Sequence, residues 1–82
     1  MLKAIAVNIE EIYVPGGLRK ELDPQKVESV AEKIMEETEE NPIQVRLGKD
    51  RYVLIKGVHR LEARKALGDD TIQAFIVAAH QH

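Results

Sequence analysis

The stretch RYVLIKGVHRLEARKALG, residues 51–68, decides the fold of this protein. Its first five residues are β-branched, aromatic or apolar for the most part and predict a strand, which Lys56 and Gly57 close. From Val58 to Leu67 the pattern predicts a short helix, and Gly68 stops it as a left-handed cap. A glycine between a strand and a helix start exposes backbone N–H groups and admits a close ligand, an arrangement that suits phosphate.

The residues upstream supply a partner strand and a longer helix. Ile43 to Leu47 predicts the first strand of a hairpin that turns at Gly48-Lys49-Asp50. Before it, Asp23 is a helix N-cap and Pro24 occupies the first helical position, where its missing N–H costs nothing. This helix is expected to reach about Glu37 and to pack on a sheet through one apolar stripe. The stripe consists of Val27, Val30, Ala31, Ile34 and Met35.

Both ends of the chain predict extended structure. Alternation from Leu2 to Ile9 indicates a strand, and Glu11 to Val14 indicates a short extended stretch before Pro15-Gly16-Gly17. A flexible loop is expected from there to Leu22. Thr71 to Ala78 predicts a final strand of β-branched and aromatic character. The expected fold class is therefore α+β, with two main helices against a small mixed sheet.

Length and composition limit the function classes. The 82 residues suit a single domain, residues 1–82, and twelve Lys and Arg against fourteen Asp and Glu give a net charge of -2. This balance argues against a large nucleic-acid interface, so any anion site must be local. The absence of cysteine excludes a disulfide framework, a thiolate zinc cluster and a cysteine nucleophile. With no signal peptide or apolar run of bilayer length, we expect a cytoplasmic protein that does not contact membranes.

Charges on the first predicted helix are segregated. Helical spacing aligns Glu28, Glu32 and Glu36 on one flank. Lys26, Ser29 and Lys33 occupy the other flank. A helix built only for stability would usually interleave the signs, because like charges four residues apart repel. Since Lys26 lies in the first turn, where the helix dipole disfavours a cation, a bound phosphate would turn this cost into a gain.

The second predicted helix repeats the pattern at its start. Gly57-Val58-His59-Arg60 places an imidazole and a guanidinium at the N-terminus. One ligand with several phosphates would contact both helix starts if they face each other. Ser29 would then donate to a phosphate or ribose oxygen, or else bond back to its own helix. Each side chain alone is more simply explained as a surface or capping residue, so the prediction depends on the joint pattern. The predicted binding residues are Lys26, Ser29, Lys33, Gly57, His59 and Arg60.

Other candidate groups are less informative. Glu62 and Asp69-Asp70 are expected close to this site, where they would hold Mg²⁺ or orient a helix. His80 and His82 have the alternate spacing of a strand metal site, but a frayed terminus explains them better. Neither the phosphate-binding loop with a glycine-lysine-serine ending nor the dinucleotide fingerprint occurs, so the common nucleotide folds are not indicated.

Three segments together resemble the ParB/sulfiredoxin superfamily. They are LDPQKVES at 22–29, PIQV at 42–45 and GVHR at 57–60, and the similarity runs from about Ile5 to Val77. The resemblance implies a ParB/sulfiredoxin-like fold. It also implies that His59 and Arg60 contact ATP phosphates, that Lys26 and Ser29 contact the nucleotide, and that Lys33 occupies a position that is threonine in some members.

Two departures from these relatives narrow the expected function. Sulfiredoxins carry cysteine where this chain has Val58, so reduction of a cysteine sulfinic acid is not expected. ParB proteins have Gly-Glu-Arg-Arg-x-Arg over the same turn, and here Glu62 replaces the last arginine, which argues against a CTP switch. The leading expectation is a domain that binds nucleotide phosphates, with ATP and Mg²⁺ as possible cofactors and an unidentified protein partner as a possibility.

Two alternatives stay open at this point. One is an enzyme that transfers a phosphoryl group or hydrolyses a nucleotide in the same pocket, with a carboxylate base supplied by Glu21, Asp23 or Glu62. The other is a partition-type or nuclease-like module that associates with DNA, which the acidic net charge disfavours.

Overall fold

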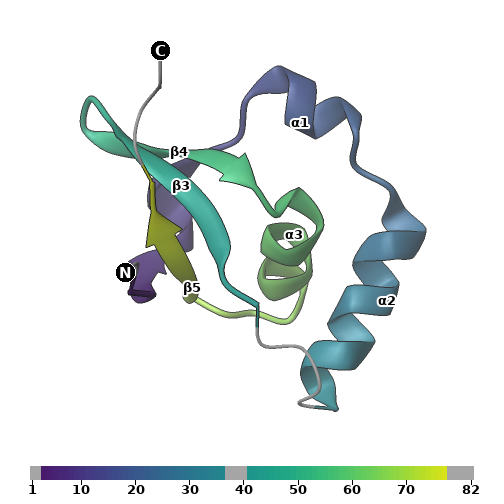
Figure 1. Cartoon of the computed structure of the whole chain (residues 1–82). Coiled ribbons are helices and arrows are strands. Elements are labelled where there is room, and N and C mark those ends of the chain that lie inside the picture. Colours follow the sequence, from purple (N-terminus) through teal and green to yellow (C-terminus); the bar gives the residue numbers. More distant parts are fainter. Residues whose placement is uncertain (1–2, 37–40, 78–82) are drawn as a thin grey trace.

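The computed structural model describes residues 3–36 and 41–77 (Figure 1). In it a five-stranded mixed sheet, with strand order β1-β5-β3-β4-β2, carries helices on one side. The strands are β1 Ile5–Asn8, β2 Ile12–Tyr13, β3 Ile43–Gly48, β4 Arg51–Lys56 and β5 Thr71–Ile76. The helices are α1 Gly16–Lys20, α2 Pro24–Met35 and α3 Val58–Ala66, with a 3₁₀ turn η1 at Ile9–Glu11. The predicted α+β class with a small mixed sheet is confirmed.

Strand pairing explains how distant segments meet. β1 runs antiparallel to β5 and β3 antiparallel to β4, whereas β3 with β5 and β2 with β4 are parallel. The predicted hairpin is confirmed, and its turn places Asp50 at a φ of 65°. The core lies between the sheet and α3, and its largest fully buried side chains are Ile43, Val45, Leu54 and Leu61.

The apolar stripe of α2 packs differently from the prediction. α2 makes its main contacts with α3 and lies outside it in Figure 1, so it forms an outer layer instead of packing on the sheet. No residue of α2 is fully buried, and Met35 at the end of the stripe is 63% exposed. The reason is that α3 already occupies the face of the sheet on which α2 would pack. Because α3 has only nine residues, it offers α2 a short surface to pack against.

The segment expected as a flexible loop contains a helix. The carbonyl of Pro15 accepts hydrogen bonds from the N–H groups of Leu18 at 3.1 Å and Arg19 at 3.0 Å, which close the first turn of α1. Leu18 and Leu22 pack against the core and hold this turn in place. The expectation was wrong because it rested on the low helix propensity of the two glycines. The two leucines that anchor the helix are partly buried through tertiary contacts, which the local sequence does not show.

The element ends differ slightly from those predicted. β1 stops at Asn8, and Ile9 instead begins η1, where its N–H donates to the carbonyl of Asp70 at 2.9 Å. α2 ends at Met35 with Glu36 as C-cap, and α3 ends at Ala66 before Gly68, whose φ is 86°. The predicted ends at Glu37 and Ala78, like His80 and His82, lie outside the described residues. No helix in the described part of the chain is long and apolar enough to cross a membrane.

Candidate functional site

Gly57 allows the start of α3 to lie close to the sheet at the candidate site. It is the N-cap of α3 with φ 110° and ψ 33°, a region that disfavours residues with a Cβ. A Cβ at this position would lie 2.6 Å from Cγ2 of Ile43, a buried residue of β3. Glycine therefore lets the start of α3 approach the sheet closely. Because glycine has no side chain to cap the helix, the N–H groups of the first turn point toward the space in front of it.

A hydrogen bond joins the starts of the two main helices. The backbone N–H of Asp23, the N-cap of α2, donates to Nε2 of His59 at 3.0 Å. The two starts therefore lie side by side, as a shared ligand requires. Since Nε2 accepts here, Nδ1 is the ring nitrogen left to donate a hydrogen bond. Arg60 supplies a permanent charge at the start of α3, because a guanidinium stays protonated.

The side-chain carboxylate of Asp23 changes the role that we expected for the start of α2. Oδ1 of Asp23 accepts a hydrogen bond from the N–H of Gln25 at 3.0 Å, so the predicted N-cap is confirmed. This carboxylate already supplies negative charge to the first turn of α2. The start of α3 is therefore a better place to bind an anion than the start of α2. Lys26 contributes its side-chain charge from the neighbouring helix.

One cavity of about 570 Å³ contains all six predicted binding residues on its lining. It lies where the end of α1, the inner side of α2, the end of β4 and the start of α3 come together. Among the described residues that line it, there are four basic side chains and one carboxylate, that of Glu21. This local excess contrasts with the net charge of -2 for the whole chain. The lining is Leu18, Glu21, Lys26, Ser29, Val30, Lys33, Ile55, Lys56, Gly57, Val58, His59 and Arg60.

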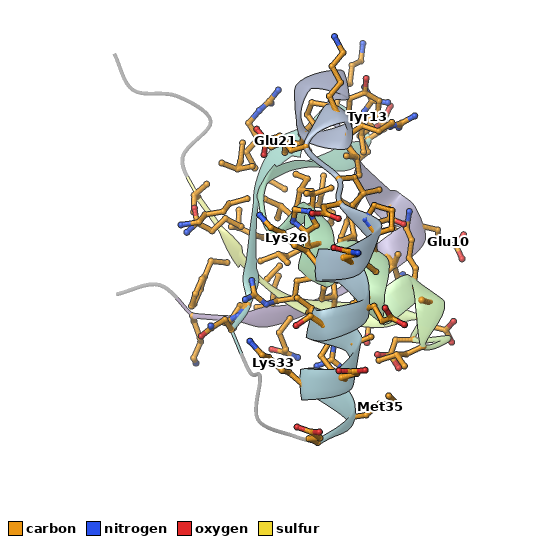
Figure 2. The ribbon with its side chains drawn as sticks, turned by 90° about the vertical axis from the view of Figure 1, so that its right-hand side faces the viewer. Glu10, Tyr13, Glu21, Lys26, Lys33 and Met35 are labelled. Carbon is orange, nitrogen blue, oxygen red and sulfur yellow. The ribbon has the colours of Figure 1, made fainter. Side chains whose placement is uncertain are left out.

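Figure 2 shows on which sides of α2 its labelled side chains leave the helix. Lys26 and Lys33 leave the helix on the same side, while Met35 points to the other side. Glu21 lies above Lys26, at the end of α1, and Glu10 lies at the right-hand edge of the molecule in this view. The segregation of charges predicted from helical spacing therefore turns the two lysines toward the cavity.

The lining also contains residues that the sequence did not single out. Leu18 from α1 and Val30 from α2 add apolar surface, and Lys56 adds a fourth cation. Ile55 reaches the lining because the register of β3 and β4 shifts between Gln44 and Val45. Such a bulge depends on strand pairing and leaves no local sequence signal.

The acidic residues expected near the site, Glu62, Asp69 and Asp70, do not line the cavity. Asp69 and Asp70 follow the far end of α3 and line a separate hollow, so their expected place near the site is wrong. The reason is helix length, since nine residues at 1.5 Å each put about 13 Å between the two ends. Glu62 pairs with Lys65 at 3.3 Å. Among the described residues, no three His, Cys, Asp or Glu side chains gather as a metal site.

We expect His59→Ala to loosen the junction of the two helix starts. The substitution removes the acceptor of the Asp23 N–H, which should lower the free energy of unfolding by about 1 kcal/mol. Amide hydrogen exchange of Asp23 should accelerate relative to wild type. The amide of Val27, which donates to the carbonyl of Asp23 at 3.0 Å, serves as the internal control. Equal acceleration at both amides would indicate general unfolding of α2 and contradict a local role for His59.

Comparison with known proteins gives a consistent result for the fold. A model of the ParB N-terminal domain family matches residues 3–82. Sulfiredoxin from Arabidopsis thaliana superposes with a TM-score of 0.81 at 27% identity, over 94% of this chain and 86% of the other. No curated protein matches in the sequence comparison.

Two structures solved with nucleotides share the fold at lower identity. ParB from Caulobacter crescentus, complexed with CTP-gamma-S, has a TM-score of 0.78 at 20% identity, over 96% of this chain. A free serine kinase in complex with AMP has a TM-score of 0.76 at 16% identity, over 93% of this chain. This chain spans 46% of that ParB chain and 31% of that kinase chain.

Proposed function

The chain belongs to the ParB N-terminal domain family, and from this premise we propose that it binds a nucleotide, ATP in the first instance, by its phosphates. The observation that carries the proposal is the single cavity on which Lys26, Lys33 and Arg60 meet the start of α3. Cations that converge on one cavity suit one compact polyanion better than an extended nucleic acid, which needs a long charged surface.

Each part of the cavity has a role in this proposal. The N–H groups of the first turn of α3 would donate to phosphate oxygens, and Gly57 allows the phosphates to approach the backbone. Arg60 and Lys26 would supply most of the opposing charge, and the Nδ1–H of His59 a further hydrogen bond. Ser29 and Lys33 would contact the ribose or a second phosphate. The apolar lining residues Leu18, Val30 and Ile55 would cover a base.

The residues present fit a magnesium ion that arrives with the nucleotide. Mg²⁺ commonly keeps several waters and is held by substrate phosphates with one or two carboxylates. Glu21 is the one carboxylate among the described lining residues, so it would be the protein ligand, directly or through water. The ion would supply charge neutralisation at the phosphates.

Sulfinic acid reduction stays outside the proposal. At the position of the sulfiredoxin cysteine, Val58 is 5% exposed and belongs to the hydrophobic core. Its side chain is used for packing, and it offers no nucleophile for a thiol-based step.

Calorimetric titration of ATP with Mg²⁺ tests the proposal. We expect Lys26→Ala to weaken binding about tenfold, because a charge-assisted contact of about 1.5 kcal/mol is lost. Lys20→Ala is the matched control, since Lys20 is exposed on α1 and does not line the cavity. An affinity unchanged in Lys26→Ala, or reduced equally in both variants, would contradict the site assignment.

A second candidate function is phosphoryl transfer from the bound nucleotide, which the position of Glu21 favours. Of the three candidate bases, Asp23 is engaged as a helix cap and Glu62 pairs with Lys65, whereas Glu21 lines the cavity. A carboxylate beside the phosphates can orient or deprotonate a hydroxyl acceptor or water.

The test of this second function is ADP formation with and without a panel of small hydroxyl acceptors. We expect Glu21→Gln to lower the rate by about 10²-fold or more, while ATP affinity measured without Mg²⁺ changes little. Glu10→Gln is the control, because Glu10 lies away from the cavity (Figure 2). Equal ADP formation in Glu21→Gln and wild type would show that Glu21 is not the base. If wild type forms no ADP, phosphoryl transfer is contradicted and only nucleotide binding remains as the proposed function.

A further inference from the structure

A second hollow of about 350 Å³ adjoins the first cavity. Two of its residues, Lys56 and Arg60, also line the first cavity, so the two spaces share this pair of cations. We call it the Phe75 hollow. Its lining is Asn41, Pro42, Gln44, Lys56, Arg60 and Phe75.

Strand register builds the floor of the Phe75 hollow. Gln44 on β3 lies directly opposite Phe75 on β5 and opposite Lys56 on β4. Residues directly opposite one another in a sheet share a face, so a ring, an amide and an ammonium group form one row. With strands about 4.8 Å apart, this row spans about 10 Å, which matches a small organic molecule. Arg60 reaches the row from the start of α3.

The chemistry of the Phe75 hollow differs from that of the first cavity. Gly57, Val58 and His59 do not line it, so it lacks the helix-start N–H groups that favour phosphate. It offers instead planar donors: the guanidinium of Arg60 and the side-chain amides of Gln44 and Asn41. A guanidinium fork with amides beside an aromatic ring matches a carboxylate carried on a small apolar or planar body.

We propose that the Phe75 hollow is a subsite for a small organic carboxylate. Arg60 and Lys56 neutralise the carboxylate, Gln44 donates to one of its oxygens, and Phe75 contacts the body of the molecule. Binding in the hollow stands independently of the nucleotide. Only the further consequence rests on the proposed function: because Arg60 is shared, the carboxylate would lie next to the nucleotide phosphates and be the second ligand of the same site.

The experiment uses backbone amide chemical shifts of the full chain. Benzoate, succinate and inorganic phosphate are titrated separately as probes. We expect at least one carboxylate to produce saturable shifts at Gln44 and Phe75, and phosphate to shift Val58 and His59 instead. If both carboxylates leave Gln44 and Phe75 unchanged, or shift only the residues that phosphate shifts, the proposal is overturned.

Two glutamine variants provide a matched pair. Gln44→Ala should weaken the responding carboxylate about tenfold, through loss of a hydrogen bond to a charged group. Gln73→Ala, an exposed amide on β5 outside the hollow, should leave its affinity unchanged. Equal affinities in the two variants would contradict the assignment.

ATP titration of the same samples separates this proposal from the nucleotide site. Carboxylate shifts without ATP binding would support the Phe75 hollow and remove the proposed function. ATP binding without carboxylate shifts would support the proposed function and overturn the carboxylate subsite.

Discussion

Gly57→Ala should lower the free energy of unfolding by about 2–5 kcal/mol, because two separate costs add. The first is backbone strain, since φ at Gly57 is 110° and an L side chain rarely adopts this conformation. The second is overpacking, because the new Cβ would meet Cγ2 of Ile43 at 2.6 Å. Ile43 is 1% exposed and belongs to the close-packed core, so a shift of its side chain would disturb its neighbours.

Urea denaturation of three glycine variants distinguishes these two costs. Gly68 also has a positive φ, 86°, but a Cβ there meets nothing within 4 Å, so Gly68→Ala should cost only about 1 kcal/mol. Gly16, inside α1, has neither constraint, and Gly16→Ala should be neutral or stabilise by about 0.4–1 kcal/mol. A Gly57→Ala variant no less stable than Gly68→Ala would show that α3 can move away from β3.

Arg60→Ala should produce the largest functional loss among single side-chain removals. Its guanidinium lines both the first cavity and the Phe75 hollow, so its removal leaves either anion without its main opposing charge. We expect ATP affinity to fall about 10- to 100-fold, from the loss of about 1.5–3 kcal/mol of charge-assisted hydrogen bonding. The affinity of the carboxylate that occupies the Phe75 hollow should fall over the same range.

Arg64→Ala is the matched control for this loss. Arg64 lies one turn further along α3, pairs with Asp69 at 3.0 Å and lines neither hollow. Because this ion pair is partly exposed, its removal should cost at most about 1 kcal/mol of stability and leave ATP affinity unchanged. Calorimetry on both variants, with circular dichroism to verify folding, provides the comparison. Equal ATP affinity in the two variants would remove Arg60 from the phosphate site.

The sequence predicted well wherever a signal was local. Asp23-Pro24 marked the start of α2 because an N-cap carboxylate and a proline at the first position act within one turn. Gly48-Lys49-Asp50 marked the hairpin turn, and Gly68 the end of α3. The charge segregation that turns Lys26 and Lys33 to one side follows from helical spacing alone (Figure 2).

Prediction failed where the outcome depended on contacts between distant segments. Leu18 and Leu22 hold α1 against a core that no local pattern shows. The bulge that turns Ile55 into the cavity arises from pairing of β4 with β3. The misplacement of Asp69 and Asp70 has a simpler cause: they follow the end of α3, about 13 Å along the helix from the start that lines the cavity.

The residue types that line the proposed phosphate site and the order of the main helices and strands could therefore be predicted from the sequence, because caps, turns and helical periodicity act over a few residues. Only the tertiary structure placed the start of α2 against the start of α3, through the bond from Asp23 to His59, and so converted two cationic helix starts into one cavity. It alone also set Phe75, Gln44 and Lys56 in one row, because sheet register is decided by the packing of whole strands.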